Sequence, residues 1–184
     1  MAVPDFFTEA LATRFRGDRP VYGLRGVSLR PEGNRGRWPT MTDLAGELAD
    51  EIGLSDSVGY ANPRQIRELS KRVGEAIGAA AFAGLHLHNT RGLGLANVLA
   101  GLDVGVRTFD SSLAGLGGCP FAPGATGNIV TEDLVFMLHS MGIVTGIDVV
   151  HLLKVREILS EAMPGEELYG FTAAAGLPLG FDSR

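Results

Sequence analysis

After residue 50, short apolar runs alternate along the chain with polar or glycine-rich turns and with stretches in which apolar residues recur at helical spacing. This pattern predicts strands that are each followed by a helix. We expect strands over residues 51–56, from the apolar run 79–83 through His88, and over 104–110. The expected helices cover residues 64–77, 94–100, 131–141 and 148–162. Alternating strands and helices with short links indicate an α/β fold with a parallel sheet.

Local signals refine this outline. Asn62 is a suitable N-cap and Pro63 a suitable first residue for the helix over 64–77. Residues 6–15 have helical spacing of apolar residues, and residues 21–29 are compatible with a strand. Loops or coil are expected over 30–39, 111–130 and 165–184. About four strand-helix units result, whereas a closed (β/α)8 barrel has eight units and typically about 250 residues.

His86 and His88 are two residues apart in the second expected strand, so they would share one face of the sheet. Two imidazoles on one face can hold a divalent metal ion. The carboxyl ends of parallel strands are also where α/β folds place catalytic groups. The alternative is that one or both histidines are buried, neutral and hydrogen-bonded.

Composition narrows the functional classes. The 184 residues are 45% hydrophobic, which suits a globular α/β domain. A net charge of −5 provides no broad basic surface, so nucleic-acid binding is not expected. The single cysteine, Cys119, excludes an internal disulfide. No apolar run approaches the ~20 residues of a membrane-spanning helix, and the N-terminal residues lack the order of a signal peptide, so we expect a cytoplasmic protein without a membrane partner.

Three segments together resemble the hydroxymethylglutaryl-CoA lyase family: residues 86–92 with the His-x-His pair, residues 110–128 with a Gly-Gly-Cys-Pro loop, and residues 56–63. The His-x-His pair alone is similar to a wider superfamily of metal-dependent lyases, aldolases and Claisen-condensing enzymes. The Gly-Gly-Cys-Pro loop resembles the lyase branch in particular. The resemblance covers residues 43–181, and residues 25–28 are similar to the fifth strand of the family.

This resemblance implies a TIM barrel, of which the chain would carry about the last four of eight β/α units. The first strand of the family holds an adjacent arginine and aspartate, and no segment here matches it. We therefore expect residues 1–184 to form a single domain equivalent to the C-terminal half of the barrel, with a poorly matched segment over 1–40 and a tail over 165–184. A truncated gene, a misplaced start codon, a split protein and a deliberate fragment would all give this pattern.

The resemblance also implies roles for individual residues. His86, His88 and Asn128 would bind a divalent metal ion, Mg²⁺ or Mn²⁺, for which imidazole nitrogens and an amide oxygen are suitable ligands. The alternative for Asn128 is hydrogen bonding within its loop. Cys119 would be a catalytic thiol that assists proton transfer, in a glycine-rich loop able to close over substrate. The alternative for Cys119 is a buried structural thiol.

Other polar residues have less specific signals. His86 is a candidate for the first proton transfer as well as a metal ligand, and Asp56 would either bind substrate or anchor its own turn. Arg91 would contact a phosphate or carboxylate of the substrate, or lie on the surface. Asp110 and Glu132 are weaker candidates, since charges beside a loop and in a first helical turn have structural reasons. Asn89 stands where many family members have aspartate, which leaves the acyl-CoA substrate open.

The reaction that the resemblance implies is cleavage of 3-hydroxy-3-methylglutaryl-CoA, or a related 3-hydroxyacyl-CoA, into acetyl-CoA and acetoacetate. The arginine of the first strand would stabilise the enolate, so we expect this chain to be inactive alone. The alternatives are an aldolase or Claisen-condensing enzyme of the same fold, and a non-catalytic half-barrel that serves as an interaction module. Expected partners are the acyl-CoA substrate and either a second copy or a complementary N-terminal half, which would pair with open strand edges.

Overall fold

The computed structural model describes residues 13–14, 51–118, 124 and 126–181. The elements, in which η denotes a 3₁₀ helix, are β1 (Thr13–Arg14), β2 (Glu51–Asp56), α2 (Pro63–Ile77), η2 (Ala79–Ala81), β3 (Phe82–Leu87), α3 (Gly94–Asp103), β4 (Phe109–Asp110), η3 (Leu113–Gly115), α4 (Thr131–Ser140), α5 (Val149–Ala162) and α6 (Phe171–Ala175). Strands and helices alternate from β2 to β4, which confirms the predicted α/β class.

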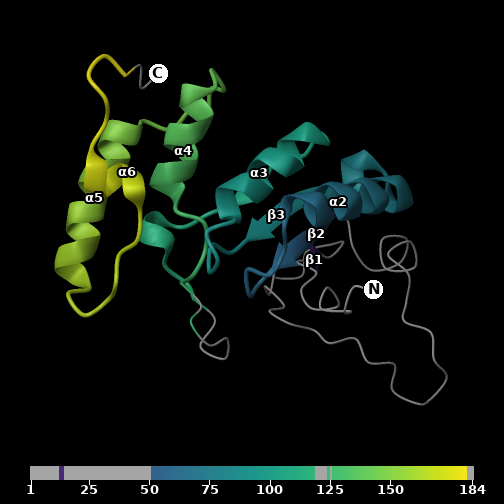
Figure 1. Cartoon of the computed structure of the whole chain (residues 1–184), viewed down its shortest axis with the longest axis horizontal. Helices are drawn as coiled ribbons and strands as arrows, with labels where there is room; N and C mark the ends of the chain where they lie inside the picture. Colours follow the sequence, from purple (N-terminus) through teal and green to yellow (C-terminus); the bar gives the residue numbers. More distant parts are fainter. Residues whose placement is uncertain (1–12, 15–50, 119–123, 125, 182–184) are drawn as a thin grey trace.

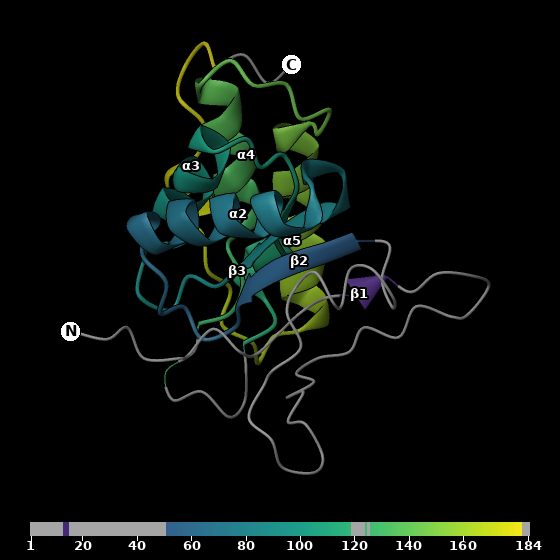
Figure 2. The same cartoon turned by 90° about the vertical axis from the view of Figure 1, so that its right-hand side faces the viewer.

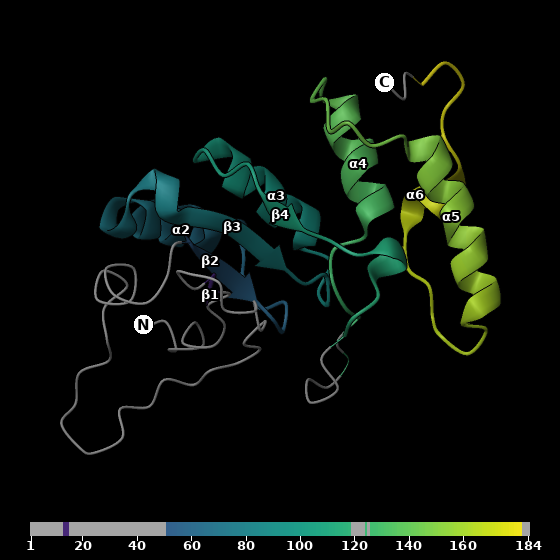
Figure 3. The ribbon, with the colours of Figure 1, turned by 180° about the vertical axis from the view of Figure 1, so that it is seen from behind.

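The strands form one sheet in the order β1-β2-β3-β4. Strands β2 and β4 each pair with β3 in parallel, as predicted, while the two-residue β1 pairs with β2 in antiparallel fashion. Helices α2 and α3 lie side by side over one face of this sheet (Figure 1). In the view from behind, β3 lies in front of these helices, and its carboxyl end points toward the segment that leads into α4 (Figure 3).

Helices α4, α5 and α6 form a second group beyond the carboxyl end of β3. Figure 2 shows α5 standing across the direction of α2, behind the sheet. Helix α4 contacts α5, α6 and η3, whereas α2 and α3 contact each other and the strands. The carboxyl ends of β2 and β3 therefore face the junction between the two helical groups, and this junction contains the residues of the candidate site.

The core lies between the sheet and its helices. Leu85 and Leu87 of β3 are 2% and 0% exposed. They pack with Ile66 of α2 and Val98 of α3. Because side chains alternate along a strand, the side chain of His86 points to the other face. The rest of the core cluster comes from Ala61, Ala100, Val106, Ile129, Leu134 and Leu138.

Helix α2 begins where the sequence predicts. The Asn62 side chain accepts a hydrogen bond from the Gln65 amide at 3.1 Å, and the Gln65 side chain accepts one from the Asn62 amide at 3.2 Å. Together these bonds form a capping box, and Pro63 is the first helical residue. Helix α5 starts after Asp148, whose Oδ1 accepts bonds from the amides of Val150 and His151.

The predicted strand over 104–110 was too long, since only Phe109–Asp110 is a strand. The amides of Val104 and Val106 both donate to the carbonyl of Gly101, and Gly105 has a φ of +92°. Residues 104–106 therefore form a turn at the end of α3 before the chain enters the sheet.

Three further segments differ from the expectations. Residues 79–81 form η2 rather than the start of a strand, and residues 171–175 form α6 within the expected coil. Thr13–Arg14 is a strand inside the stretch that has helical spacing. The expected strand over 21–29 and the loop over 30–39 lie outside the described residues.

Candidate functional site

His86 and His88 face each other at the carboxyl end of β3. Their Nε2 atoms are 3.1 Å apart, and the rings meet edge to face. His88 is 5% exposed, whereas the His86 side chain is 31% exposed. Burial, reinforced by the neighbouring His86 ring, lowers the pKa of His88 to about 4. His88 is therefore neutral at physiological pH, which is the form in which imidazole binds a metal ion.

The segment around Asn128 pairs with the end of β3, and this pairing places Asn128 beside the histidines. The Asn89 amide donates to the Gly127 carbonyl at 3.0 Å, and the Ile129 amide donates to the Leu87 carbonyl at 3.1 Å. His88 and Asn128 are thus directly opposite each other in an antiparallel bridge. Opposite residues of such a pair project to the same face, so the Asn128 and His88 side chains share one side of the chain.

Two buried polar atoms of this cluster, His88 Nδ1 and Asn128 Oδ1, have no hydrogen-bond partner among the described residues. The Asn128 amide is fixed at its other end, since Nδ2 donates to the Leu116 carbonyl at 2.8 Å. Imidazole nitrogens and the Asn128 Oδ1 are suitable ligand atoms for a divalent cation. Within the described ranges, no group of three or more His, Cys, Asp or Glu side chains gathers into a metal site. The donor set therefore fits part of a metal site that takes further ligands from elsewhere.

Asp110 completes the surroundings of His86. The two residues are register partners in the parallel pairing of β3 and β4, and Asp110 Oδ2 lies 3.3 Å from His86 Nδ1. A carboxylate on the far nitrogen of a histidine is the common way to orient a metal-binding imidazole. Sequence reasoning gave Asp110 little weight, although its place one strand along from His86 was the available signal.

Asp56, at the end of β2, binds its own turn. Its Oδ1 accepts from the Tyr60 amide at 2.9 Å, and its Oδ2 accepts from the Ala61 amide at 3.0 Å. Asp56 is 5% exposed, and burial raises the pKa of its carboxyl group against the opposing effect of these amides and of Arg91. Both carboxylate oxygens therefore have partners in the turn before α2.

Arg91 lies against the same turn. Its Nη1 donates to the carbonyls of Val58 and Gly59 at 3.1 and 3.3 Å. Its guanidinium stacks over the Tyr60 ring at 3.8 Å from the ring centroid. Arg91 and Asp56 are thus brought together by one turn, but none of these contacts joins them to the histidine cluster.

The segment before α4 is tightly packed around Asn128. A Cβ on Gly117 would lie 2.8 Å from Asn128 Nδ2, and a Cβ on Gly127 would lie 2.0 Å from the Gly115 carbonyl oxygen. Both glycines have positive φ, of +104° and +103°. Glycine is needed at these positions because no other side chain fits. Cys119, the expected catalytic thiol, lies outside the described residues.

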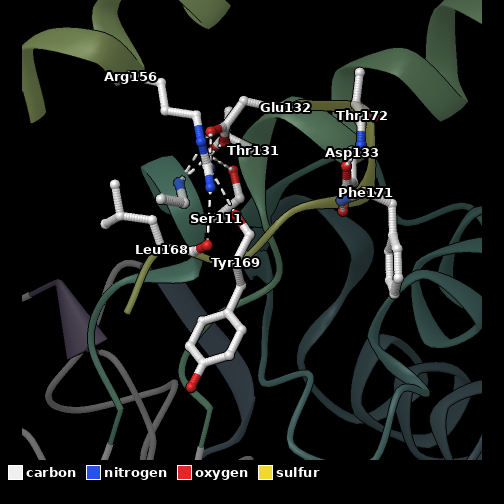
Figure 4. Close-up of polar contacts among 10 residues, drawn as sticks. Ser111, Thr131, Glu132, Asp133, Arg156, Leu168, Tyr169, Phe171 and Thr172 are labelled. Carbon is white, nitrogen blue, oxygen red and sulfur yellow. Dashed lines mark hydrogen bonds and ion pairs between the residues drawn. The ribbon is translucent and has the colours of Figure 1, made fainter. Parts of the chain in front are cut away.

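A second polar network, at the start of α4, contacts the segment that contains Ala114 (Figure 4). Glu132 is fully buried and accepts bonds from the Ala114 amide and from Arg156. Asp133 accepts from the amides of Phe171 and Thr172 at 3.0 and 2.7 Å. Sequence reasoning placed Glu132 in a first helical turn but missed Arg156, because nothing distinguishes it in the sequence from Lys154 of the same helix.

Comparisons with known proteins find relatives of this chain. The HMGL-like family model matches residues 41–159. The hydroxymethylglutaryl-CoA lyase of Pseudomonas mevalonii is 51% identical over 98 residues, which are 53% of this chain and 32% of the relative. The (R)-citramalyl-CoA lyase of Chloroflexus aurantiacus is 44% identical over 128 residues, which are 70% of this chain and 40% of the relative.

A solved structure is similar as well. The HMG-CoA lyase from Acinetobacter baumannii, in complex with coenzyme A and 3-methylmalate, has a TM-score of 0.66 and 46% sequence identity. The match covers 73% of this chain and 43% of that chain. This chain therefore spans less than half the length of the relatives that it matches.

Among the described residues, each helix is too short or too polar to cross a membrane. The cytoplasmic location predicted from the sequence stays a prediction. The extent of the family match, together with the relatives and the solved structure, shows that this chain belongs to the HMGL-like family.

Proposed function

We propose that this chain provides the histidine-bearing half of a metal-dependent carbon–carbon lyase that cleaves 3-hydroxy-3-methylglutaryl-CoA into acetyl-CoA and acetoacetate. The observation that carries the proposal is the convergence of His86, His88 and Asn128 at the end of β3, with a buried and unpartnered Asn128 Oδ1. The relatives named as hydroxymethylglutaryl-CoA lyases support the choice of reaction.

In this proposal the Nε2 atoms of His86 and His88 and the Oδ1 of Asn128 hold Mg²⁺ or Mn²⁺. The ion would supply Lewis acidity toward the tertiary hydroxyl and an adjacent oxygen of the thioester substrate. Asp110 would keep the proton of His86 on Nδ1, which leaves the lone pair of Nε2 directed at the site. The Asn128 carbonyl is positioned by its Nδ2 bond to Leu116.

Other residues have proposed roles in the cleavage. A base removes the proton of the tertiary hydroxyl, the carbon–carbon bond breaks, acetoacetate leaves, and the acetyl-CoA enolate takes up a proton. His86 is a candidate for the first proton transfer, a role that requires its Nε2 to be free of the metal ion at that step, and the Cys119 thiol is the candidate for the last. Asp56 and Arg91 would contribute to substrate binding through the turn that they hold in place.

We further propose that residues 1–184 form one domain equivalent to the C-terminal half of a TIM barrel. The coverage of 43% of the lyase structure and the parallel pairing of β2, β3 and β4 support this assignment. An aspartate ligand and an arginine that stabilises the enolate would come from the other half of the barrel. A complementary N-terminal half of the barrel would therefore be the partner that completes the site, because no segment of residues 1–184 matches the strand that carries these two residues.

A shorter acyl group is the second candidate substrate. The (R)-citramalyl-CoA lyase matches more of this chain than the Pseudomonas lyase does, at 70% against 53%. A citramalyl thioester has one methylene fewer than the hydroxymethylglutaryl thioester and would release pyruvate in place of acetoacetate. Assaying both keto acids in parallel distinguishes the two substrates once the barrel is complete. An aldolase, a Claisen-condensing enzyme and a non-catalytic half-barrel stay as alternatives.

Metal binding by the chain tests the proposal directly. Titration with Mn²⁺, followed by electron paramagnetic resonance, should show weak binding to the wild-type chain and a clear loss for His86→Ala. His151→Ala is the matched control, because His151 is an exposed histidine near the start of α5. Equal Mn²⁺ binding by the three proteins would exclude the site. Acetoacetate release from the thioester should be undetectable for the chain alone, and robust turnover would show that no other half is needed.

A further inference from the structure

Glu132 is a buried carboxylate whose charge is balanced from another helix. It is 0% exposed at the start of α4, and both of its oxygens lie 3.1 Å from the Ala114 amide nitrogen. Its Oε1 is also 2.8 Å from Nη1 of Arg156 in α5, whose side chain is 16% exposed. A carboxylate in this position requires an ion partner, because a single buried charge is strongly unfavourable. Arg156 is that partner.

Arg156 holds the chain beyond α5 as well. Its Nη1 donates to the Tyr169 carbonyl at 2.6 Å, and its Nη2 donates to the Leu168 carbonyl at 2.9 Å (Figure 4). The two Nη atoms of the planar guanidinium reach these carbonyls and Glu132 together, whereas lysine offers a single nitrogen on a shorter side chain. The Tyr169 amide in turn donates to the Ala114 carbonyl at 2.9 Å. The N–H group of Ala114 is therefore bonded to Glu132 and its carbonyl to Tyr169, and Arg156 holds both of these residues.

Ala114 links this network to Asn128. Its φ of 55° and ψ of 17° are left-handed, and Ala114 is the one non-glycine residue with positive φ in the described part of the chain. Such a conformation persists only where the surroundings fix it. The turn continues to Leu116, whose carbonyl accepts the bond from Asn128 Nδ2. The turn fixed at Ala114 thus ends at the residue that orients the Asn128 amide.

We propose that Arg156 is a positioning residue for the candidate metal site. By holding Glu132 and residues 168–169, it maintains the left-handed turn at Ala114 and thereby places the Leu116 carbonyl that orients Asn128 beside His88. Only the metal-binding part of the test below rests on the proposed function. The amide exchange rates test whether Arg156 fixes the turn at Ala114, whatever the function of the chain.

Amide hydrogen exchange of the full chain tests the positioning role. In Arg156→Met, the amides of Ala114 and Tyr169 should exchange at least about tenfold faster, because charge-assisted bonds that fix their partners are lost. The amide of Leu85, which donates to the Thr108 carbonyl in the sheet, should exchange as in the wild type. Lys154→Met, an exposed change in the same helix, is the matched control and should leave all of these amides unchanged.

Arg156→Lys keeps the test decisive if loss of the ion pair prevents folding. Lysine still neutralises Glu132, so the Ala114 amide should stay protected, whereas the single nitrogen on the shorter lysine side chain should hold the carbonyls of residues 168 and 169 less well. Faster exchange at Tyr169 without a change at Leu85 supports the proposal. Exchange rates equal to those of Lys154→Met would overturn it, as would a uniform increase that includes Leu85.

Mn²⁺ binding separates positioning from a purely structural role. The dissociation constant for Mn²⁺ should rise several-fold in Arg156→Lys relative to Lys154→Met, since a weakened bond from the Tyr169 amide to the Ala114 carbonyl loosens the turn that orients Asn128. Faster exchange at Tyr169 with unchanged Mn²⁺ affinity would overturn the positioning role. A wild-type chain that binds no Mn²⁺ would refute the proposed function, and the exchange rates would still decide whether Arg156 fixes the turn.

Discussion

Asp110 Oδ2 lies 3.3 Å from His86 Nδ1, across the parallel pairing of β3 and β4. An acceptor at Nδ1 favours the tautomer in which Nδ1 carries the proton and Nε2 presents its lone pair. The His86 Nε2 is also the atom that faces His88. The Asp110 carboxylate thus makes Nε2 the nitrogen with which His86, the less buried histidine of the pair, can bind a ligand.

We expect Asp110→Ala to raise the dissociation constant for Mn²⁺ about tenfold, because the His86 ring loses the acceptor that orients it. Nitrogen-15 spectra of the imidazoles should also show a smaller population of the Nδ1-protonated form of His86. Asp103→Ala is the control, since Asp103 is an exposed carboxylate that pairs with Arg67 instead. An unchanged affinity and tautomer in Asp110→Ala would show that this carboxylate has no role at the site.

Gly127→Ala should destabilise the protein by at least about 2 kcal/mol, since the new methyl group would clash with a backbone oxygen in a left-handed conformation. The Cβ would lie 2.0 Å from the Gly115 carbonyl oxygen, at a φ of +103°. Urea unfolding measures this loss. The substitution should also weaken Mn²⁺ binding, because Gly127 precedes Asn128.

Gly74→Ala is the matched glycine substitution. Gly74 lies inside α2, and a Cβ on it would have no neighbouring atom within 4 Å beyond the backbone of its own helix. Alanine there should stabilise the chain by about 0.5–1 kcal/mol, because it lowers the conformational entropy of the unfolded state. If both glycine substitutions changed the free energy of unfolding equally, the tight packing around Gly127 would not be present in solution.

The stability of the chain should depend on pH through Asp56. Burial raises the pKa of this carboxyl group above its ordinary value of 3.8, so the folded state holds the proton more tightly than the unfolded state. Its contribution to stability is therefore fully present below the unfolded pKa and is lost as the pH rises through the folded pKa. The free energy of unfolding of the wild type, relative to Asp56→Asn, should increase as the pH is lowered from 7 toward 4. Urea titrations across this range would contradict the raised pKa if the difference decreased.

The chain should associate through its sheet. Strand β4 has only two residues at one edge, and an open edge offers unpaired backbone groups to another chain. We expect dimers, larger species or aggregates rather than a 19.4 kDa monomer in size-exclusion chromatography with light scattering. The contact is expected at β4, the described edge of the sheet, while the edge near residues 21–29 that the sequence also predicts lies outside the described residues. A monodisperse monomer that resists aggregation would show that both edges are covered.

The sequence predicted β2 and the start of α2 well, because both depend on residues that are close together in the chain. The bounds of β2 agree with the prediction, and Asn62 and Pro63 marked the start of α2 because capping depends on neighbouring residues. In β3 the alternation of Leu85, His86 and Leu87 places both leucines in the core and His86 on the other face. The same alternation misled at residues 104–110, where Gly105 ends a helix in a turn rather than extending a strand.

Long-range contacts could not be read from the sequence in this way. The shared face of His86 and His88 follows from a period of two, whereas the place of Asn128 beside them came only from the family resemblance. The ion pair of Glu132 and Arg156 joins two helices through a buried contact that leaves no periodic signal. The binding of Asp56 and Arg91 to one turn likewise depends on the packing of β2 against the segment after β3.

The antiparallel bridge between His88 and Asn128 has a consequence for folding. The two residues lie on opposite sides of α3, β4 and η3 in the sequence, so their pairing closes a long loop and incurs its entropic cost. The histidine pair needs only one strand, whereas Asn128 joins it only when the chain has returned past α3, β4 and η3. We therefore expect this corner to be the last to assemble during folding and among the first to open in local unfolding.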